Sequence, residues 1–422
     1  MSTDRRTFLK AGAALAAGGT AKLAHSEDTL KARADDVLKR AADAGDIPGV
    51  VAVATDRQGD IYEGGFGRRV VGEQSPMTAD TVFWIASMTK AITGTAAMQL
   101  VEQGKVNLDS PASHWVPDLA RAQVLDGWDA DGQPRLRAPK RPITLRHLLT
   151  HTAGFSYDLW NADLVRYQAL RGIPGVGSCK NIALTTPLMF DPGERWEYGI
   201  NIDWAGKMVE NVSRSTLGSY LKDNVFDPLG MNSTAFKITP DMRSRLAKVH
   251  AHGEDGSYKP IELEMPQEPE FEMGGGGLYS TAGDYIRFIR MLLNGGALDG
   301  NRVLKPDTVK LMSQNHIGDL NVTPLRTAIP DASNDFDPWP DQDKKWGLSF
   351  MINTQRTPEG RSPGSLAWAG LANTYYWLDP SRNVGGVILT QILPFIDPKV
   401  MALYAEFERG VYRSLDGTKA AA

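Results

Sequence analysis

The chain has 422 residues, of which 42% are hydrophobic and 23% charged, and its formal net charge is −4. This length and composition are typical of a globular protein with a large core, arranged as two or three domains or as one domain with an insertion. The small acidic excess gives no electrostatic reason to expect nucleic acid as a partner. A single cysteine, Cys179, excludes an internal disulfide and a thiolate metal cluster within one chain. Beyond the N-terminus there is no run of roughly 18 apolar residues, so no membrane span is expected in the mature chain.

Residues 1–26 are typical of a bacterial export signal. The run Arg5-Arg6-Thr7-Phe8-Leu9-Lys10 is a twin-arginine pattern, and an apolar stretch rich in Ala and Gly follows it over residues 11–19. We therefore expect a mature protein that is periplasmic or secreted. The cleavage point stays open among three small residues: Ala21, Ala24 and Ser26.

Both ends of the remaining chain have the pattern of an antiparallel sheet. Residues 50–54 and 61–66 are strand-like and flank a polar turn, which predicts a β-hairpin. Residues 373–378 and 384–391 repeat this arrangement around a second turn. Helical spacing of apolar residues appears before the first hairpin, over residues 28–43, and after the second, over residues 398–414.

The middle of the chain is mostly helical in pattern. Helices are predicted over residues 87–103, 144–150, 201–211, 216–225 and 282–294. Two long polar segments, 121–142 and 316–345, are expected to be lids or mobile surface.

The predicted fold class is therefore α+β. An antiparallel sheet flanked by helices is built from residues 27–85 and 295–415, and residues 86–294 form a mostly helical insertion domain. Residues 416–422 are expected to be a flexible tail.

Several common functional motifs are absent or incomplete. His147 and His151 have a spacing that occurs in zinc sites, but Leu148 occupies the position of the general base, so we interpret both as structural. The glycines at 274–277 lack the Lys-Ser/Thr of a phosphate-binding loop, and we expect them to let backbone approach a site closely. Cys179 is interpreted as a bystander. No cofactor and no metal are implied.

Ser87-Met88-Thr89-Lys90 is the pattern that carries chemistry. On a helix the residues at i and i+3 share a face, so the Lys90 amine can reach the Ser87 hydroxyl. A serine hydroxyl is a poor nucleophile until a neighbour takes its proton, and a lysine can do so when burial lowers its pKa. The tetrapeptide alone is weak evidence, because Ser219-Tyr220-Leu221-Lys222 fits it too; we interpret that second match as helix surface.

The first pattern is accompanied by further segments in a fixed order. With these segments the chain resembles the serine β-lactamase and penicillin-binding-protein superfamily, and within it the class C-like family VIII carboxylesterases. The resemblance covers most of residues 45–395 and rests on the following segments: 83–90 (FWIASMTK), 145–154 (LRHLLTHTAG), 192–198 (PGERWEY), 227–231 (DPLGM), 275–281 (GGGLYST) and 368–370 (WAG).

The resemblance implies a site in the cleft between the sheet and the helical domain. It implies that Ser87, Lys90 and Tyr198 are catalytic. A phenol held close to the Lys90 cation can become a phenolate and act as a base, and we expect Lys90 and Tyr198 together to take the serine proton. It also implies an oxyanion hole formed by the backbone N–H groups of Ser87 and Leu371. The segment Trp368-Ala369-Gly370 would then contact the substrate.

Two departures from the lactamase pattern favour simple esters as substrates. Ile200 stands where lactamases have the Asn of their Tyr-x-Asn motif, and Asn201 is one position late. Trp368 stands where lactamases have a cationic or histidine residue, so the usual partner of a substrate carboxylate is missing. An apolar part of the substrate is expected among tryptophans: Trp84, Trp160, Trp196 and Trp368.

The sequence thus predicts an exported serine hydrolase that cleaves a small-molecule carboxylic ester through an acyl-enzyme. Three alternatives stay open: a β-lactamase or D-amino-acid peptidase, an acyltransferase that uses the same acyl-enzyme, and a non-catalytic cell-wall-binding or sensor domain. The oligomeric state and the natural substrate are not predicted.

Overall fold

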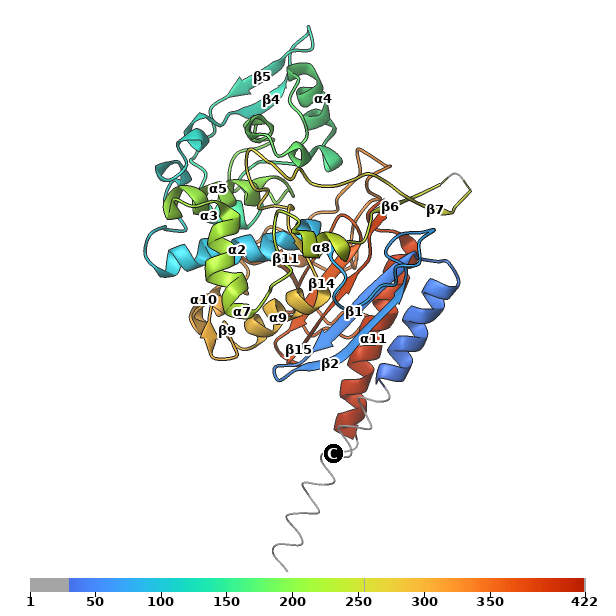
Figure 1. The fold of residues 1–422 in the computed structure, drawn as a ribbon. Helices are drawn as coiled ribbons and strands as arrows, with labels where there is room; N and C mark the ends of the chain where they lie inside the picture. Colours follow the sequence, from blue (N-terminus) through green and yellow to red (C-terminus); the bar gives the residue numbers. More distant parts are fainter. Residues whose placement is uncertain (1–29, 254, 421–422) are drawn as a thin grey trace, which may run out of the picture.

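The computed structural model describes residues 30–253 and 255–420 (Figure 1). The expected export signal, residues 1–26, lies outside the described residues. Within them, a large antiparallel sheet and a mostly helical region lie against each other, and the two described ends of the chain lie together beside the sheet (Figure 1). The expected α+β class is confirmed.

The sheet is built from the two ends of the chain. Its strand order is β11-β12-β13-β14-β15-β1-β2, and each neighbouring pair is antiparallel. The two expected hairpins are β1–β2 and β14–β15. All of β1 is buried because helices cover both faces of the sheet, which explains its unbroken apolar sequence. The strands are β1 (Gly49–Thr55), β2 (Asp60–Gly67), β11 (Lys344–Trp346), β12 (Met351–Asn353), β13 (Leu366–Gly370), β14 (Thr374–Asp379) and β15 (Val384–Leu389).

Strand β14 shows how the two faces are covered. Tyr375 stacks on Tyr404 of α11 (Pro398–Ala420), with ring centroids 4.8 Å apart. The next residue, Tyr376, lies 5.2 Å from Tyr285 of α9 (Ala282–Leu293). Successive side chains of a strand point to opposite faces, so α11 and α9 sandwich the sheet.

The first described helix, residues 30–43, lies beside α11 (Figure 1). Tyr62 of β2 joins the two, because its hydroxyl donates to Asp35 at 2.9 Å and its ring packs on Phe407 at 5.5 Å. The helix α11 is longer than expected. It continues to Ala420 and so includes most of the expected tail at 416–422.

The central segment is largely helical, as expected, with short strand pairs between the helices. Residues 121–142 are not a structureless lid, because β4 and β5 form a hairpin there. The helix α9 falls within 86–294 but packs on β1 and β15 of the sheet. The helices are α2 (Thr89–Glu102), α3 (Leu145–Leu149), α4 (Ala162–Arg171), α5 (Asn201–Ser213), α6 (Leu217–Leu221), α7 (Asp227–Leu229), α8 (Pro240–Ser244) and α10 (Pro306–Met312). The short strands are β3 (Phe83–Trp84), β4 (Val124–Trp128), β5 (Pro134–Arg137), β6 (His250–His252), β7 (Tyr258–Pro260), β8 (Tyr279–Ser280), β9 (Ala297–Leu298), β10 (Asn301–Arg302) and β16 (Ile392–Leu393).

The helix α2 crosses the molecule between the sheet and the helical region. Its residues from Thr89 to Leu100 are all buried. A helix that is buried on every side has no polar face, which fits the run of small and apolar residues in its sequence. The site described below begins at its N-terminus.

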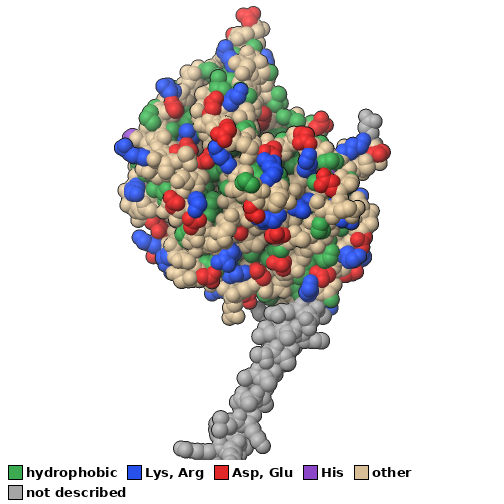
Figure 2. Space-filling model, in the orientation of Figure 1, with side chains coloured by type: hydrophobic (Ala, Val, Ile, Leu, Met, Phe, Trp, Pro, Cys, Tyr) green, Lys and Arg blue, Asp and Glu red, His purple; other side chains and the backbone are tan. Residues whose placement is uncertain are grey.

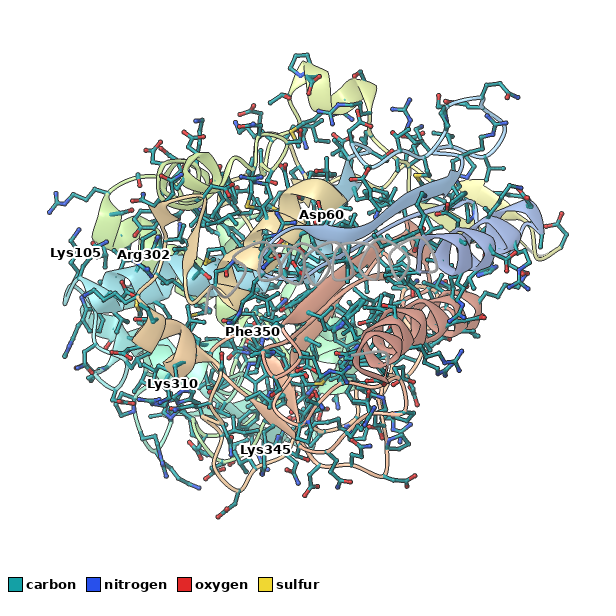
Figure 3. All side chains as sticks on the ribbon, turned by 90° about the horizontal axis from the view of Figure 1, so that it is seen from below. Asp60, Lys105, Arg302, Lys310, Lys345 and Phe350 are labelled. Atoms are coloured by element: carbon teal, nitrogen blue, oxygen red, sulfur yellow. The ribbon has the colours of Figure 1, made fainter. Side chains whose placement is uncertain are left out.

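Side chains at the surface and in the interior follow the expected division. Figure 3 places Phe350 inside the molecule and Lys105 and Lys310 at its rim. Basic and acidic side chains alternate over the face shown in Figure 2. Across the described ranges, none of the helices combines the length and the apolarity that crossing a membrane requires.

A buried ion pair fixes α11 to the segment before β13. Arg361 donates through Nε and Nη2 to the two carboxylate oxygens of Glu408, at 2.6 and 2.7 Å, and the side chains are only 3% and 1% exposed. The Glu408→Gln variant leaves a buried guanidinium without its countercharge. We expect the free energy of unfolding, measured by urea denaturation, to fall by about 3–5 kcal/mol.

The matched control is Glu262→Gln. Glu262 is 89% exposed and pairs with Lys248 at the surface, so its loss should cost less than about 1 kcal/mol. Equal effects of the two substitutions would contradict the structural role of the buried pair.

Candidate active site

Ser87 lies in a strained connection between a strand and a helix. The strand β3 pairs with β8, a short 3-10 helix follows over Ala86–Met88, and α2 begins at Thr89. Ala86 has a φ of +43°, in the left-handed region that residues other than glycine rarely adopt. Backbone strain of this kind persists where the surrounding structure enforces it, and it concentrates at functional sites.

Lys90 is completely buried beneath Ser87. Its Nζ donates to the Ser87 Oγ at 3.0 Å, to the Tyr157 hydroxyl at 3.0 Å and to the Gly275 carbonyl at 2.5 Å. An ammonium has three N–H donors and no acceptor, so these partners occupy its full capacity. Burial lowers the pKa of Lys90 to about 7, against an opposing effect of the Asp203 carboxylate. A share of the molecules therefore carries a neutral amine next to the serine at neutral pH.

Tyr198 also lies next to the Lys90 amine. The Lys90 Nζ is 4.6 Å from the centre of the Tyr198 ring, and the Tyr198 hydroxyl accepts a hydrogen bond from the Trp368 indole at 2.9 Å. Burial raises the pKa of Tyr198, and the hydrogen bonds with Ser87 and Trp368 offset this only in part. The free protein therefore holds Tyr198 as a neutral phenol, and not as the phenolate that the sequence analysis considered as one form of the base.

Two residues of the site were missed by the sequence interpretation. Tyr157 accepts a hydrogen bond from Lys90, and burial together with the Asp203 carboxylate raises its pKa. Asp203, on α5, is buried and its Oδ1 accepts the Gly275 N–H at 2.8 Å. Burial raises the pKa of Asp203, opposed by Lys90. Neither residue belongs to a spacing pattern, so only the fold reveals them.

The glycine run lets backbone approach the site, as expected. Gly275 donates its N–H to Asp203 and accepts from Lys90. A Cβ at this position would lie 2.5 Å from Asp203 Oδ2 and 2.9 Å from the Tyr157 hydroxyl. Both distances are shorter than van der Waals contact, so only glycine fits.

The end of β13 brings the expected third motif to Ser87. A Cβ at Gly370 would lie 2.3 Å from the Ile85 carbonyl oxygen, so glycine allows this strand to reach the segment that carries the serine. Ser87, Trp368, Ala369 and Leu371 line one cavity. The structure therefore brings the expected oxyanion residues, Ser87 and Leu371, to one cavity.

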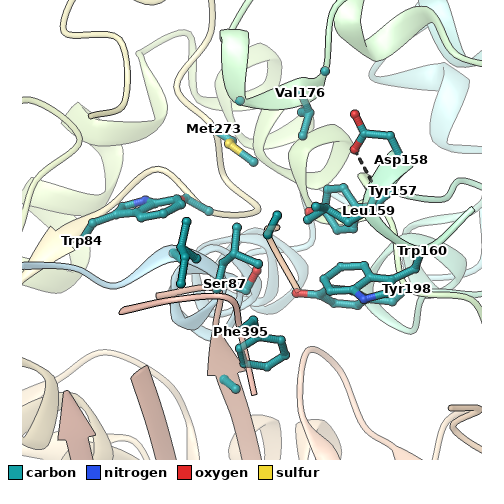
Figure 4. A pocket seen from close by; sticks show the side chains of 18 of the residues that line it. Trp84, Ser87, Tyr157, Asp158, Leu159, Trp160, Val176, Tyr198, Met273 and Phe395 are labelled. Atoms are coloured by element: carbon teal, nitrogen blue, oxygen red, sulfur yellow. Dashed lines mark hydrogen bonds between the residues drawn. The ribbon is translucent and has the colours of Figure 1, made fainter. Parts of the chain in front are cut away.

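The cavity has a volume of about 430 Å³ and is mostly apolar (Figure 4). Of the tryptophans expected around an apolar substrate group, Trp84, Trp160 and Trp368 line it. Trp196 does not belong to the described lining and instead stacks behind Tyr198. Leu325 and Ala332 come from the long polar segment 316–345, which thus forms part of the cavity wall. Further apolar lining residues include Val176, Ile261, Leu263, Met265, Met273, Leu393 and Phe395.

The chain as a whole matches known proteins. A family model described as Beta-lactamase matches residues 34–410. The chain belongs to the beta-lactamase family.

Relatives in this family resemble the chain over nearly its full length. Lovastatin esterase of Penicillium rubens is 33% identical over 91% of this chain and 99% of its own. Monacolin J acid methylbutanoyltransferase of Aspergillus terreus is 33% identical over 90% of this chain and 94% of its own. The structure of a simvastatin synthase variant from Aspergillus terreus has a TM-score of 0.79 and 32% identity, covering 91% of this chain and 98% of that one.

Other candidate residues lie apart from the site around Ser87. Ser219 is exposed, and Lys222 forms a surface pair with Asp227, so the second Ser-x-x-Lys match lies on a helix surface. His147 takes part in capping α3, with its Nδ1 accepting the Thr144 N–H. Within residues 30–253 and 255–420, no group of three or more His, Cys, Asp or Glu side chains is arranged to hold a metal.

Proposed function

We propose that this protein is a serine hydrolase that cleaves carboxylic esters through an acyl-enzyme on Ser87. The observation that carries the proposal is the contact between the Ser87 hydroxyl and the buried Lys90 amine, at the wall of a mostly apolar cavity. A neutral amine at 3.0 Å is placed to accept the serine proton. The named activities of the relatives, an esterase and a methylbutanoyltransferase, support the same chemistry.

In the proposed first step, the Ser87 Oγ attacks the ester carbonyl carbon and its proton passes to the Lys90 Nζ. The carbonyl oxygen becomes an oxyanion, stabilised by the N–H groups of Ser87 and Leu371. In other enzymes, removing one such fixed donor raises the activation free energy by about 3 kcal/mol. The ester C–O bond then breaks and leaves an acyl group on Ser87.

Tyr198 is proposed to be the proton donor for the leaving alcohol. Its hydroxyl, held by Trp368, passes a proton to the departing alcohol oxygen and regains one from Lys90. Water then enters, gives a proton to the same pair and attacks the acyl carbonyl carbon. The pair passes that proton to the Ser87 Oγ as the bond between Oγ and the acyl carbon breaks, so the carboxylic acid leaves and the serine hydroxyl is restored. Since the pKa of Tyr198 is raised, the phenol is a proton relay in this scheme and Lys90 is the base.

The cavity favours esters over β-lactams and D-amino-acid peptides. Those substrates carry a carboxylate that a cationic side chain normally binds. Among the described residues that line the cavity, none is Lys, Arg or His. Trp368, at the position of the usual cation, instead uses its N–H on Tyr198.

Acyl transfer to an alcohol is the second candidate function. It shares the acyl-enzyme and differs only in the acceptor, an alcohol in place of water. The methylbutanoyltransferase and the simvastatin synthase among the relatives favour it. The mostly apolar lining offers water few hydrogen-bond partners, which also favours an organic acceptor.

The place of action is proposed to be the periplasm or the exterior. The support is the twin-arginine pattern at Arg5-Arg6 with the apolar stretch after it. Replacing both arginines by lysine should retain the unprocessed protein in the cytoplasm of the producing cell.

The Ser87→Ala variant tests the nucleophile. Hydrolysis of p-nitrophenyl butyrate by the purified protein should fall at least about a thousandfold, because the acyl-enzyme cannot form. The matched control is Ser219→Ala, in the exposed second Ser-x-x-Lys match, which should retain the wild-type rate. Activity that survives in Ser87→Ala, or is lost in Ser219→Ala, would overturn the assignment.

A second experiment separates hydrolysis from acyl transfer. A competing alcohol is added to the reaction, and the carboxylic acid and the new ester that form are both quantified.

The Trp368→Phe variant tests the proton relay. It removes the indole N–H that fixes the Tyr198 hydroxyl but keeps an aromatic ring in the wall. We expect kcat for p-nitrophenyl butyrate to fall roughly 10- to 100-fold, since a misplaced proton donor loses most of its effect. Trp339→Phe is the control, because the Trp339 indole donates to Glu359 outside the cavity. Similar losses in both variants would contradict a specific role of the Trp368 contact.

A further inference from the structure

Asp158 is the one charged side chain among the described residues that line the cavity. It follows Tyr157 in the chain and lies on the same side of the cavity as Tyr157, Leu159 and Val176 (Figure 4). The remaining lining is apolar, aromatic or uncharged. A single carboxylate in such a lining makes the electrostatic potential more negative on its side of the cavity.

The Asp158 carboxylate has no countercharge in the described parts of the chain. Its Oδ1 accepts the Leu159 N–H at 3.1 Å, and the side chain is half-buried. Its Oδ2 lies 2.9 Å from the point where a Cβ on Gly175 would stand, so a side chain at position 175 would crowd the carboxylate. Burial raises the pKa of Asp158, whereas the Leu159 N–H favours the charged form.

Aromatic rings line the same cavity as this carboxylate. Trp160 lies 6.0 Å from Tyr157 and 5.4 Å from Tyr198, measured between ring centroids. Trp84 and Trp368 line other parts of the wall. Aromatic faces attract an ammonium group, and a neighbouring carboxylate adds a direct Coulomb attraction. The same carboxylate repels an anionic substrate.

We propose, resting on the ester hydrolase function above, that the cavity selects esters that carry an ammonium group, and that Asp158 determines this specificity. The ammonium would lie against Asp158 and the aromatic rings while the ester carbonyl reaches Ser87. Asp158 therefore acts in substrate choice and takes no part in the bond-forming steps. Esters that carry a carboxylate are poor substrates, because the Asp158 carboxylate repels them.

The test compares kcat/KM for pairs of esters that differ only in charge. With the charge on the alcohol, the pair is butyrylcholine and its carbon isostere dimethylbutyl butyrate. With the charge on the acyl group, the pair is the p-nitrophenyl ester of trimethylammoniobutanoic acid and its carbon isostere. In at least one pair the wild type should prefer the cation roughly tenfold or more.

The Asp158→Asn variant should bring the ratio of kcat/KM for the cationic ester to kcat/KM for its neutral isostere close to one. The Asp158→Glu variant should restore a preference for the cationic ester. Asp131→Asn, in the exposed turn between β4 and β5, makes the same charge change outside the cavity and should leave the ratio as in the wild type. A wild-type ratio near one in both pairs, or a preference that persists in Asp158→Asn, would overturn the proposal. Failure to hydrolyse any of these esters, cationic or neutral, would instead overturn the ester hydrolase function.

Discussion

The burial of the Lys90 amine is the constraint on which the rest of the site depends. An ammonium that is fully removed from water is stable only where its donors are satisfied, and here two hydroxyls and a backbone carbonyl satisfy them. The nearest carboxylate, Asp203, does not contact the amine directly but holds the N–H of the same glycine. Desolvation therefore outweighs charge pairing, and the pKa of Lys90 is lowered.

The position of α2 and two close backbone approaches keep the Lys90 amine buried. The helix α2 is enclosed between the sheet and the helical region, so a lysine in its first turn has no route to solvent. Glycines at 275 and 370 let two backbone segments close around the pair of Ser87 and Lys90. The strained φ of Ala86 fits the same interpretation, since a packed environment must hold it. Stability and reactivity thus rest on the same close contacts.

The chain sequence was sufficient for the local parts of this arrangement. Ser87 and Lys90 are three residues apart where a 3-10 helix leads into α2, and both hairpins have short turns, so local spacing predicted them. Tyr157 and Asp203 were missed because their contacts with Lys90 join distant segments that no spacing records. Trp196 was placed in the cavity because tryptophan content alone cannot tell a lining ring from one behind it. The length of α11 was underestimated because its polar C-terminal residues lack a clear stop signal.

The pH dependence of kcat/KM for p-nitrophenyl butyrate tests the central claim most directly. Below its pKa Lys90 is protonated and cannot accept the serine proton, and above it the neutral amine can, so activity must rise with pH. Because burial lowers the pKa of Lys90 to about 7, the account predicts a rise centred near neutrality and a plateau above it. The Lys90→Arg variant, whose guanidinium stays protonated, should be inactive throughout. A profile that is flat across neutrality, or that rises only near pH 10 where an ordinary lysine or tyrosine titrates, would contradict the account.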